Sequence, residues 1–185
     1  MRLLVAALES EVVAFPAELE GFDRLITGPG KLPAAVNLTR ALSATDYEEI
    51  VVVGTAGCID PLLQGDLHEI AGAIQHDVTD PDGVVGQHLS LPARVGHDRE
   101  GVIIATGDSF VDDAETVKLI RSLGAGLVDM ETYAYFWVAA EFGVPIRVLK
   151  AVSDNAQDDA MTDWDAAVTA CSHILRERIR ADYGV

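Results

Sequence analysis

The sequence predicts a single-domain α/β protein, a three-layer fold whose central sheet is mixed but largely parallel. The chain has 185 residues, of which 49% are hydrophobic, and this is enough for one sizeable buried core. Several apolar runs are short and continuous, which is typical of strands buried on both faces. These runs alternate with segments of helical spacing, the pattern of a sheet covered by helices. We therefore expect one domain over residues 1–185.

In the first half of the chain, apolar runs predict three strands, and helical spacing predicts two helices. In order, these are a strand at Leu3–Leu8, a short helix at Val12–Leu19, a strand at Arg24–Thr27, a helix at Lys31–Ala44 and a strand at Ile50–Val53. The last strand is a continuous β-branched run. Gly54–Gly57, which follows it, is expected to end it.

The second half repeats the alternation around one predicted loop, Thr79–Gly86. The predicted strands are Asp66–Ala73, Val102–Ala105, Leu127–Met130 and Ile146–Val152, and the predicted helices are Asp112–Leu123, Glu131–Phe142 and Asp163–Arg180. Asp112 or Asp113 can cap the first of these helices, and Gly143–Pro145 ends the second.

The net charge excludes two classes of partner. With 13 basic and 30 acidic residues the formal charge is −17, which repels phosphate backbones and anionic lipids. We therefore expect neither a nucleic acid nor a membrane as partner. Glu9 and Glu11 directly follow the first apolar run, which argues against a signal peptide and favours a cytoplasmic protein.

Cysteine usage gives no sign of a structural metal or a disulfide framework. Cys58 and Cys171 lie far apart, and neither has the spacing of a zinc ligand set. Cys171 and His173 lie on a predicted amphipathic helix, where packing is the favoured interpretation over a catalytic pair. We expect no cofactor and no bound metal.

Three carboxylates, Glu11, Glu131 and Asp154, lie at the ends of separate predicted strands. Ligands of such folds bind beyond the carboxyl ends of the strands, so the sheet can bring these residues to one edge. Together they would suit acid–base chemistry or a divalent cation. Each is also explained as a solvated acid near a helix N-terminus, where acidic residues are favoured.

Two glycine turns, Gly28–Lys31 and Gly54–Gly57, follow strands and let the backbone approach a ligand. Neither matches a nucleotide-phosphate motif, and tight packing explains them equally well. His76 and Asp77 are interpreted as a pair that supports a site from behind, or as part of a loop.

Seven short motifs together resemble those of the methylthioadenosine/S-adenosylhomocysteine nucleosidases, in the purine nucleoside phosphorylase superfamily. In chain order they are Ala7–Val12 (ALESEV), Gly28–Lys31 (GPGK), Val53–Gly57 (VGTAG), Gly65–Leu67 (GDL), Thr106–Val111 (TGDSFV), Val128–Glu131 (VDME) and Lys150–Asp154 (KAVSD). Asp129 and Lys150 stand where that family usually has glutamate and arginine. The segments before Gly28 and between His76 and Val102 are short for the family, which leaves the 5′ substituent open.

The resemblance implies a catalytic set of three residues. Asp154 would protonate N7 of the leaving purine, and Ser153 would orient it. Glu11, rather than Glu9, would activate the attacking water.

The resemblance also implies the residues that bind substrate. Glu131 would hold the ribose hydroxyls and Met130 would pack under the sugar. Phe110 would stack on the base, and the backbone of Val111 would contact its edge. The remaining implied contacts are Thr55, Ala56 and Gly57.

These roles predict hydrolysis of the N-glycosidic bond of purine nucleosides, with 5′-modified adenosines such as methylthioadenosine or S-adenosylhomocysteine as substrates. Glu9–Glu11 and Val51–Val53 stand where the phosphorylases of the superfamily carry arginines, which favours water over phosphate. Futalosine hydrolase, a purine nucleoside phosphorylase and a non-catalytic nucleoside-binding protein remain alternatives. The resemblance also implies a homodimer.

Overall fold

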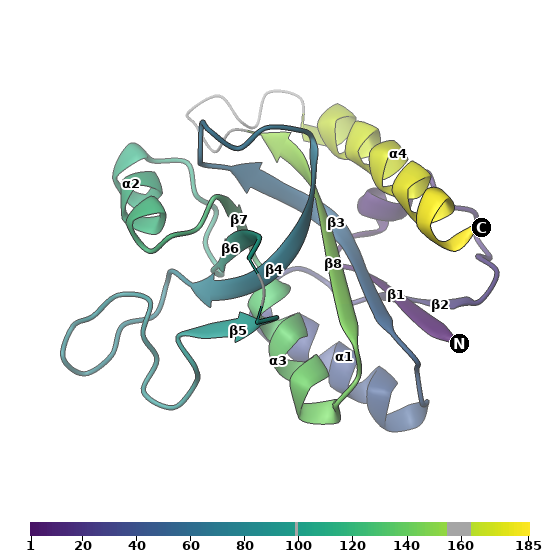
Figure 1. Cartoon of the computed structure of the whole chain (residues 1–185), viewed down its shortest axis with the longest axis horizontal. Coiled ribbons are helices and arrows are strands. Elements are labelled where there is room, and N and C mark those ends of the chain that lie inside the picture. The colour runs from purple at the N-terminus through teal and green to yellow at the C-terminus, as the bar shows by residue number, and fades with distance from the viewer. Residues whose placement is uncertain (99, 155–163) are drawn as a thin grey trace.

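The structure is a computed structural model that describes residues 1–98, 100–154 and 164–185 (Figure 1). Its strands are β1 (Arg2–Ala6), β2 (Phe22–Ile26), β3 (Ile50–Cys58), β4 (Leu67–Gln75), β5 (Arg94–Gly96), β6 (Val102–Thr106), β7 (Leu127–Asp129) and β8 (Ile146–Asp154). Its helices are the 3-10 helix η1 (Glu9–Val12), α1 (Lys31–Ala44), α2 (Ala114–Ser122), α3 (Thr132–Phe142) and α4 (Trp164–Tyr183). Within these ranges, no helix is long and apolar enough to cross a membrane.

The eight strands in the described part of the chain belong to one mixed sheet. β1 pairs in parallel with β2 and β3, β3 with β8, β4 with β6, and β6 with β7. The pairs β3–β7, β4–β5 and β4–β8 are antiparallel. Because β3, β8, β4, β6 and β7 pair in a cycle, this part of the sheet closes into a ring.

The prediction of a single α/β domain with a mixed sheet is confirmed. The closure of the sheet was not part of the three-layer prediction. Apolar periodicity identifies strands but says nothing about which strands become neighbours.

Helices cover both faces of the sheet where β1 and β3 lie. Alternate residues of a strand point to opposite faces. In β1, Leu3 and Val5 pack into a core with α1 and α3, whereas Leu4 and Ala6 pack into a second core with η1 and α4. Figure 1 shows α1 and α3 next to each other and α4 along β3 and β8.

Two elements differ from their predictions, one after β1 and one at the end of β3. The predicted helix Val12–Leu19 is wrong: the short 3-10 helix Glu9–Val12 precedes it, and the following residues are irregular. Pro16 offers no backbone N–H for a continuing helix. The predicted end of the strand after Val53 is also wrong, because β3 continues through the glycines to Cys58.

Other differences are smaller. The short strand β5 was not predicted, since its three residues carry too little periodicity to be recognised. The predicted terminal helix starts at Asp163, which lies outside the described residues, and α4 is described from Trp164 onward.

Candidate active site

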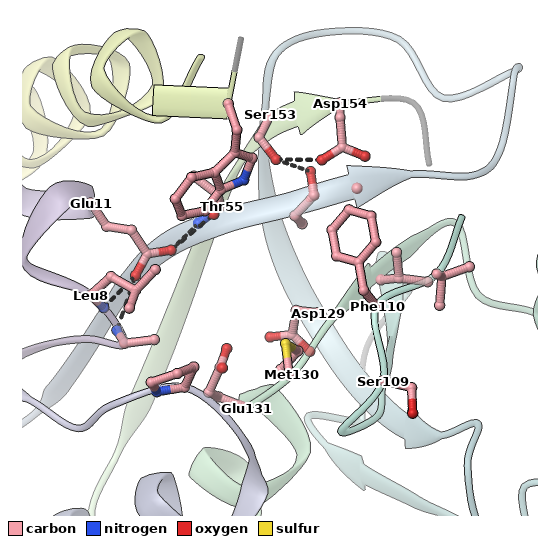
Figure 2. A pocket seen from close by; sticks show the side chains of 17 residues that line it. Leu8, Glu11, Thr55, Ser109, Phe110, Asp129, Met130, Glu131, Ser153 and Asp154 are labelled. Carbon is pink, nitrogen blue, oxygen red and sulfur yellow. Dashed lines mark hydrogen bonds between the residues drawn. The ribbon is translucent and has the colours of Figure 1, made fainter. Parts of the chain in front are cut away.

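The carboxyl ends of several strands open onto one cavity of about 330 Å³, a volume within the range of small-molecule sites. All ten residues that the sequence predicted for the site line this cavity: Glu11, Thr55, Ala56, Gly57, Phe110, Val111, Met130, Glu131, Ser153 and Asp154. Figure 2 shows Glu11 and Thr55 on one side of the cavity and Phe110 and Asp154 on another, with Met130 and Glu131 between the two sides.

Glu11 is held rigidly by four hydrogen bonds from the protein. The residue is 3% exposed, whereas Glu9 is exposed, so the two acids face different ways. Its Oε2 accepts from the backbone N–H groups of Ala7 and Leu8, both at 3.0 Å. Its Oε1 accepts from the N–H of Thr55 at 2.7 Å and from the Thr55 hydroxyl at 3.0 Å. These four bonds occupy the usual acceptor positions of a carboxylate.

Glu131 lies at the start of α3 with its side chain inside the protein. It is 5% exposed, and its Oε1 accepts from the N–H of Gly30 at 2.8 Å. The pKa of Glu131 is raised to about 7, because burial and the neighbouring carboxylate of Asp129 raise it by more than the Lys150 ammonium and the N–H of Gly30 lower it. Near neutral pH this carboxyl group therefore exchanges between its charged and neutral forms.

A buried ion pair lies beside Glu131. Lys150 Nζ contacts Asp129 Oδ2 at 2.9 Å, and each side chain is 2% exposed. Asp129 also accepts hydrogen bonds from the Thr106 hydroxyl at 2.7 Å and from both the N–H and the hydroxyl of Thr132. The pair joins β7 to β8, which are not hydrogen-bonded to each other but both pair with β3.

Gly54 lets this ion pair approach the Glu11 carboxylate. A Cβ atom at position 54 would lie 3.0 Å from Glu11 Oε1 and 3.1 Å from Lys150 Nζ. Burial lowers the pKa of Lys150, but the carboxylates of Asp129, Glu131 and Glu11 outweigh it, so its pKa is raised overall and it stays charged. We call Glu11, Asp129, Glu131 and Lys150 the floor cluster.

Ser153 and Asp154 form a second polar group. The Ser153 hydroxyl lies 2.7 Å from Asp154 Oδ2 and 3.4 Å from the carbonyl oxygen of Ala56. The sequence placed Asp154 just beyond a strand that ends at Val152, but β8 extends through Asp154 itself. The strand backbone therefore fixes both residues at the edge of the cavity.

The rest of the wall is apolar. Phe110 is 48% exposed at the mouth, whereas Val111 is 5% exposed and packs into a small core with α2. Met130 completes this side, between Phe110 and Glu131 (Figure 2). A flat aromatic group beside a polar floor suits a ligand with one apolar and one hydroxyl-bearing half.

Among the residues that the structure describes, seven more line the cavity without having been predicted. They are Ala7, Leu8, Pro29, Ser109, Val128, Asp129 and Trp164. All but Trp164 lie within the motifs that carry the family resemblance, and those motifs were the available signal. Trp164 is different because it begins α4, far in sequence from every motif, and periodicity alone marks it only as helical.

Cys171 and His173 do not form a pair in the structure. Cys171 is buried against β8, with its thiol 3.3 Å from the carbonyl oxygen of Val152, while His173 is exposed. The helix-packing interpretation is therefore confirmed. Burial raises the pKa of the Cys171 thiol to about 11, which keeps it protonated and unreactive.

Comparison with known proteins supports the resemblance found in the motifs. Residues 25–181 match the phosphorylase superfamily. The 5′-methylthioadenosine/S-adenosylhomocysteine nucleosidase of Marinomonas sp. (strain MWYL1) is 34% identical, over 82% of this chain and 76% of the relative. The nucleosidase of the same name from Geobacillus kaustophilus (strain HTA426) is 28% identical, over 92% of this chain and 91% of the relative.

Solved structures show the same fold. The Helicobacter pylori 5′-methylthioadenosine/S-adenosyl homocysteine nucleosidase superposes with a TM-score of 0.85 at 21% identity, covering 97% of this chain and 96% of the other. The corresponding nucleosidase from S. pneumoniae also gives 0.85, at 20% identity and 96% coverage of both chains. From the sequence matches and the shared fold together, the chain belongs to the phosphorylase superfamily, as a member of the methylthioadenosine/S-adenosylhomocysteine nucleosidase type.

Proposed function

We propose that this protein hydrolyses the N-glycosidic bond of 5′-modified adenosines, with methylthioadenosine and S-adenosylhomocysteine as substrates. The observation that carries the proposal is the convergence of Glu11, Glu131 and Asp154, from three separate segments, on one cavity. The names of the relatives support the choice of substrate. Cleavage of such a bond passes through a transition state with positive charge on the sugar, which carboxylates stabilise.

Glu131 is proposed to bind the ribose. An ionised carboxylate accepts hydrogen bonds from two hydroxyl groups, and such charge-assisted bonds are strong. With a pKa of about 7, Glu131 is only partly ionised in the free protein near neutrality. Hydroxyl donors from the sugar would favour its charged form, as Lys150 already does. Met130 then offers an apolar surface to the sugar ring.

Asp154 and Ser153 are proposed to act on the leaving base. The Ser153 hydroxyl donates to Asp154 Oδ2 and would orient the carboxyl group, which would carry a proton to purine N7. Phe110 and Val111 both line the cavity, and in this proposal Phe110 would cover the face of the base while the Val111 backbone would contact its edge.

Glu11 is proposed to activate water. Its backbone donors fix it in place, but the Thr55 hydroxyl is a donor that can rotate away. Such a rotation would free one lone pair of Oε1 for a water proton. In this proposal the orientation of the Thr55 hydroxyl decides whether a water molecule can bind to the Glu11 carboxylate.

Water is proposed as the acceptor instead of phosphate because of the side chains that line the cavity. Among the described residues that line it there is no arginine and no lysine. A phosphate ion would meet carboxylates there, in a protein of formal charge −17.

Product identification tests this function. Purified protein is incubated with methylthioadenosine, S-adenosylhomocysteine, adenosine and futalosine, with and without phosphate, and the products are separated by chromatography. We expect adenine and a free sugar at a rate that does not depend on phosphate, and much slower release by Asp154→Asn. A sugar 1-phosphate as main product would contradict hydrolysis. Preferred cleavage of futalosine would replace the substrate, and no cleavage by the wild type would favour a binding protein.

The predicted homodimer stays a proposal with one supporting feature. Leu32 and Val36 lie one turn apart on α1 and are 76% and 45% exposed. Exposed apolar side chains at helical spacing are typical of an association surface. Light scattering coupled to size-exclusion chromatography tests it, with Leu32→Ser expected to shift the mass toward a monomer. The cytoplasmic location also stays a prediction.

A further inference from the structure

The turn before α1 binds carboxylates of the protein itself. The N–H of Gly30 donates to Glu131 Oε1 at 2.8 Å, and the N–H of the next residue, Lys31, donates to Asp108 Oδ1 at 2.8 Å. Gly30 has φ +96°, and a Cβ atom there would lie 3.1 Å from Asp108 Oδ1. The positive φ therefore favours glycine at this position, and a side chain there would also crowd Asp108.

The Lys31 side chain ties the same region together from the other side. Its Nζ contacts Asp77 Oδ1 at 2.6 Å and Gln75 Oε1 at 3.0 Å, and lies 3.9 Å from Asp108 Oδ2. The second oxygen of Asp77 accepts the N–H of Asp108 at 2.8 Å. We call Lys31, Gln75, Asp77 and Asp108 the rim cluster.

These contacts join three parts of the chain: the start of α1, the end of β4 and the segment 107–111. That segment has no regular secondary structure, and it carries both Phe110 and Val111 into the cavity. Without the ammonium, Asp77 and Asp108 would be two carboxylates that repel each other next to this segment. The chain has only three lysines, and two of them, Lys31 and Lys150, neutralise carboxylates around the cavity.

We propose that Lys31 is a positioning residue for the base-binding side of the cavity. Through Asp77 and Asp108 it fixes the segment 107–111, so that Phe110 and Val111 are in place before the ligand arrives. It makes no contact with the ligand itself. The role of the segment in base binding rests on the proposed function, whereas its fixation by Lys31 does not.

Hydrogen–deuterium exchange of the ligand-free protein tests the fixation. Lys31→Met keeps the length of the side chain and removes the charge. We expect amide exchange in residues 107–111 to become about tenfold faster, the effect of losing hydrogen bonds to a charged group. Lys118→Met is the matched control, because Lys118 is exposed on α2. Unchanged exchange in this segment, or an equal increase throughout the chain, would overturn the proposal.

Calorimetric titration with the two halves of the substrate tests the consequence. We expect Lys31→Met to bind adenine about tenfold more weakly than the wild type, with little change for methylthioribose, and Lys31→Arg to restore most of the adenine affinity. Equal losses for both ligands, or no rescue by arginine, would overturn the positioning role. If Lys31→Met does not fold, Asp77→Asn tests the same fixation, because it removes the carboxylate that Lys31 Nζ contacts at 2.6 Å.

The two proposals fail in different ways. If the wild type binds neither adenine nor methylthioribose and cleaves no nucleoside, the proposed function is wrong, and the exchange experiment still decides the role of Lys31. If the wild type is an active hydrolase and exchange in the segment does not respond to Lys31→Met, only the inference about Lys31 is wrong.

Discussion

The floor cluster and the rim cluster each place one lysine among carboxylates, but at different depths. Lys150 and Asp129 are 2% exposed, whereas the side chains of Lys31 and Asp77 are 17% and 22% exposed. Charges in the floor interact with little screening by water, so each one changes the protonation of the others. Charges in the rim are partly hydrated and hold chain segments together with smaller energies. The floor therefore controls protonation, and the rim controls position.

The largest expected effect is the loss of the floor cation. Lys150→Met leaves Asp129 without its ion-pair partner. It also removes the positive charge that stabilises the ionised form of Glu131. We expect a loss of about 3–5 kcal/mol in the free energy of unfolding, the usual result of breaking a buried pair. Urea denaturation at pH 7 measures it, with Lys118→Met as the control for the change in charge.

The double variant Asp129→Asn with Lys150→Met sharpens this test. It removes both charges. The amide oxygen can replace Oδ2 and accept from Thr132, while the amide NH2 replaces Oδ1 and can donate to the hydroxyl oxygen of Thr106. We expect it to recover at least half of the lost stability. A single variant as stable as the wild type would show that the ammonium is not needed to keep the floor folded.

A smaller effect is expected on the reaction rate when Glu11, a member of the floor cluster, is replaced. Glu11→Gln keeps the shape of the side chain but removes the base, so we expect kcat for methylthioadenosine to fall by about 10²-fold or more. Glu9→Gln is the matched control, because Glu9 is exposed two residues away. Initial rates of adenine release compare the two variants. An active Glu11→Gln beside an inactive Glu9→Gln would reverse the assignment.

The third effect concerns how the free energy of unfolding depends on pH, and its direction follows from the raised pKa of Glu131 in the floor cluster. Glu131 has a pKa of about 7 in the folded protein, above the ordinary value of 4.5. A raised pKa means that the folded state loses stability, relative to a neutral side chain, as the pH rises from about 4.5 through 7. Glu131→Gln escapes this loss, and its amide oxygen can still accept from Gly30.

We therefore expect Glu131→Gln to be more stable than the wild type at pH 8, on the order of 2 kcal/mol, and similar to it near pH 4. The same variant should cleave methylthioadenosine poorly. Urea denaturation at the two pH values and a rate assay measure both properties. A variant that is less stable than the wild type at pH 8 would show that the buried, ionised carboxylate of Glu131 does not destabilise the folded protein.

Local patterns in the sequence were sufficient for part of this picture. The buried strands and α1, α2 and α3 follow from periodicity and from caps such as Asp113, whose side chain accepts from two N–H groups of α2. The ten cavity residues were implied by the resemblance of their motifs to those of the nucleosidases, and for Glu11, Glu131 and Asp154 their places at strand ends were a second signal. Their chemical roles remain predictions.

Features that depend on contacts between residues distant in the sequence could not be predicted from local patterns. The closure of the sheet depends on β4 pairing with both β6 and β8, and no local pattern encodes this. Lys150 was noted only as a replacement for arginine, because its pairing with Asp129 needs β7 and β8 in place. Lys31 was seen as part of a glycine turn for the same reason. Trp164 carried no signal apart from its helix.

The smallest effect is expected in the rim, and its pH dependence should be opposite to that of the floor. Burial raises the pKa of Asp77, but the Lys31 ammonium and the N–H of Asp108 outweigh this, so its pKa is lowered overall. A lowered pKa contributes stability above the unfolded value near 4, and this stability is lost as the pH falls through the folded value.

Asp77→Asn should therefore be less stable than the wild type at pH 7 by about 1 kcal/mol or less, the usual size for a partly exposed ion pair. The difference should shrink as the pH falls below about 4, because the wild-type carboxyl group becomes neutral too. Asp82→Asn, at an exposed position of the neighbouring loop, is the control for the change in net charge. As the pH rises, Glu131→Gln should become more stable relative to the wild type, whereas Asp77→Asn should become less stable relative to it. If both variants shift in the same direction in urea denaturation across this pH range, the division between floor and rim is wrong, because net charge alone would then explain both.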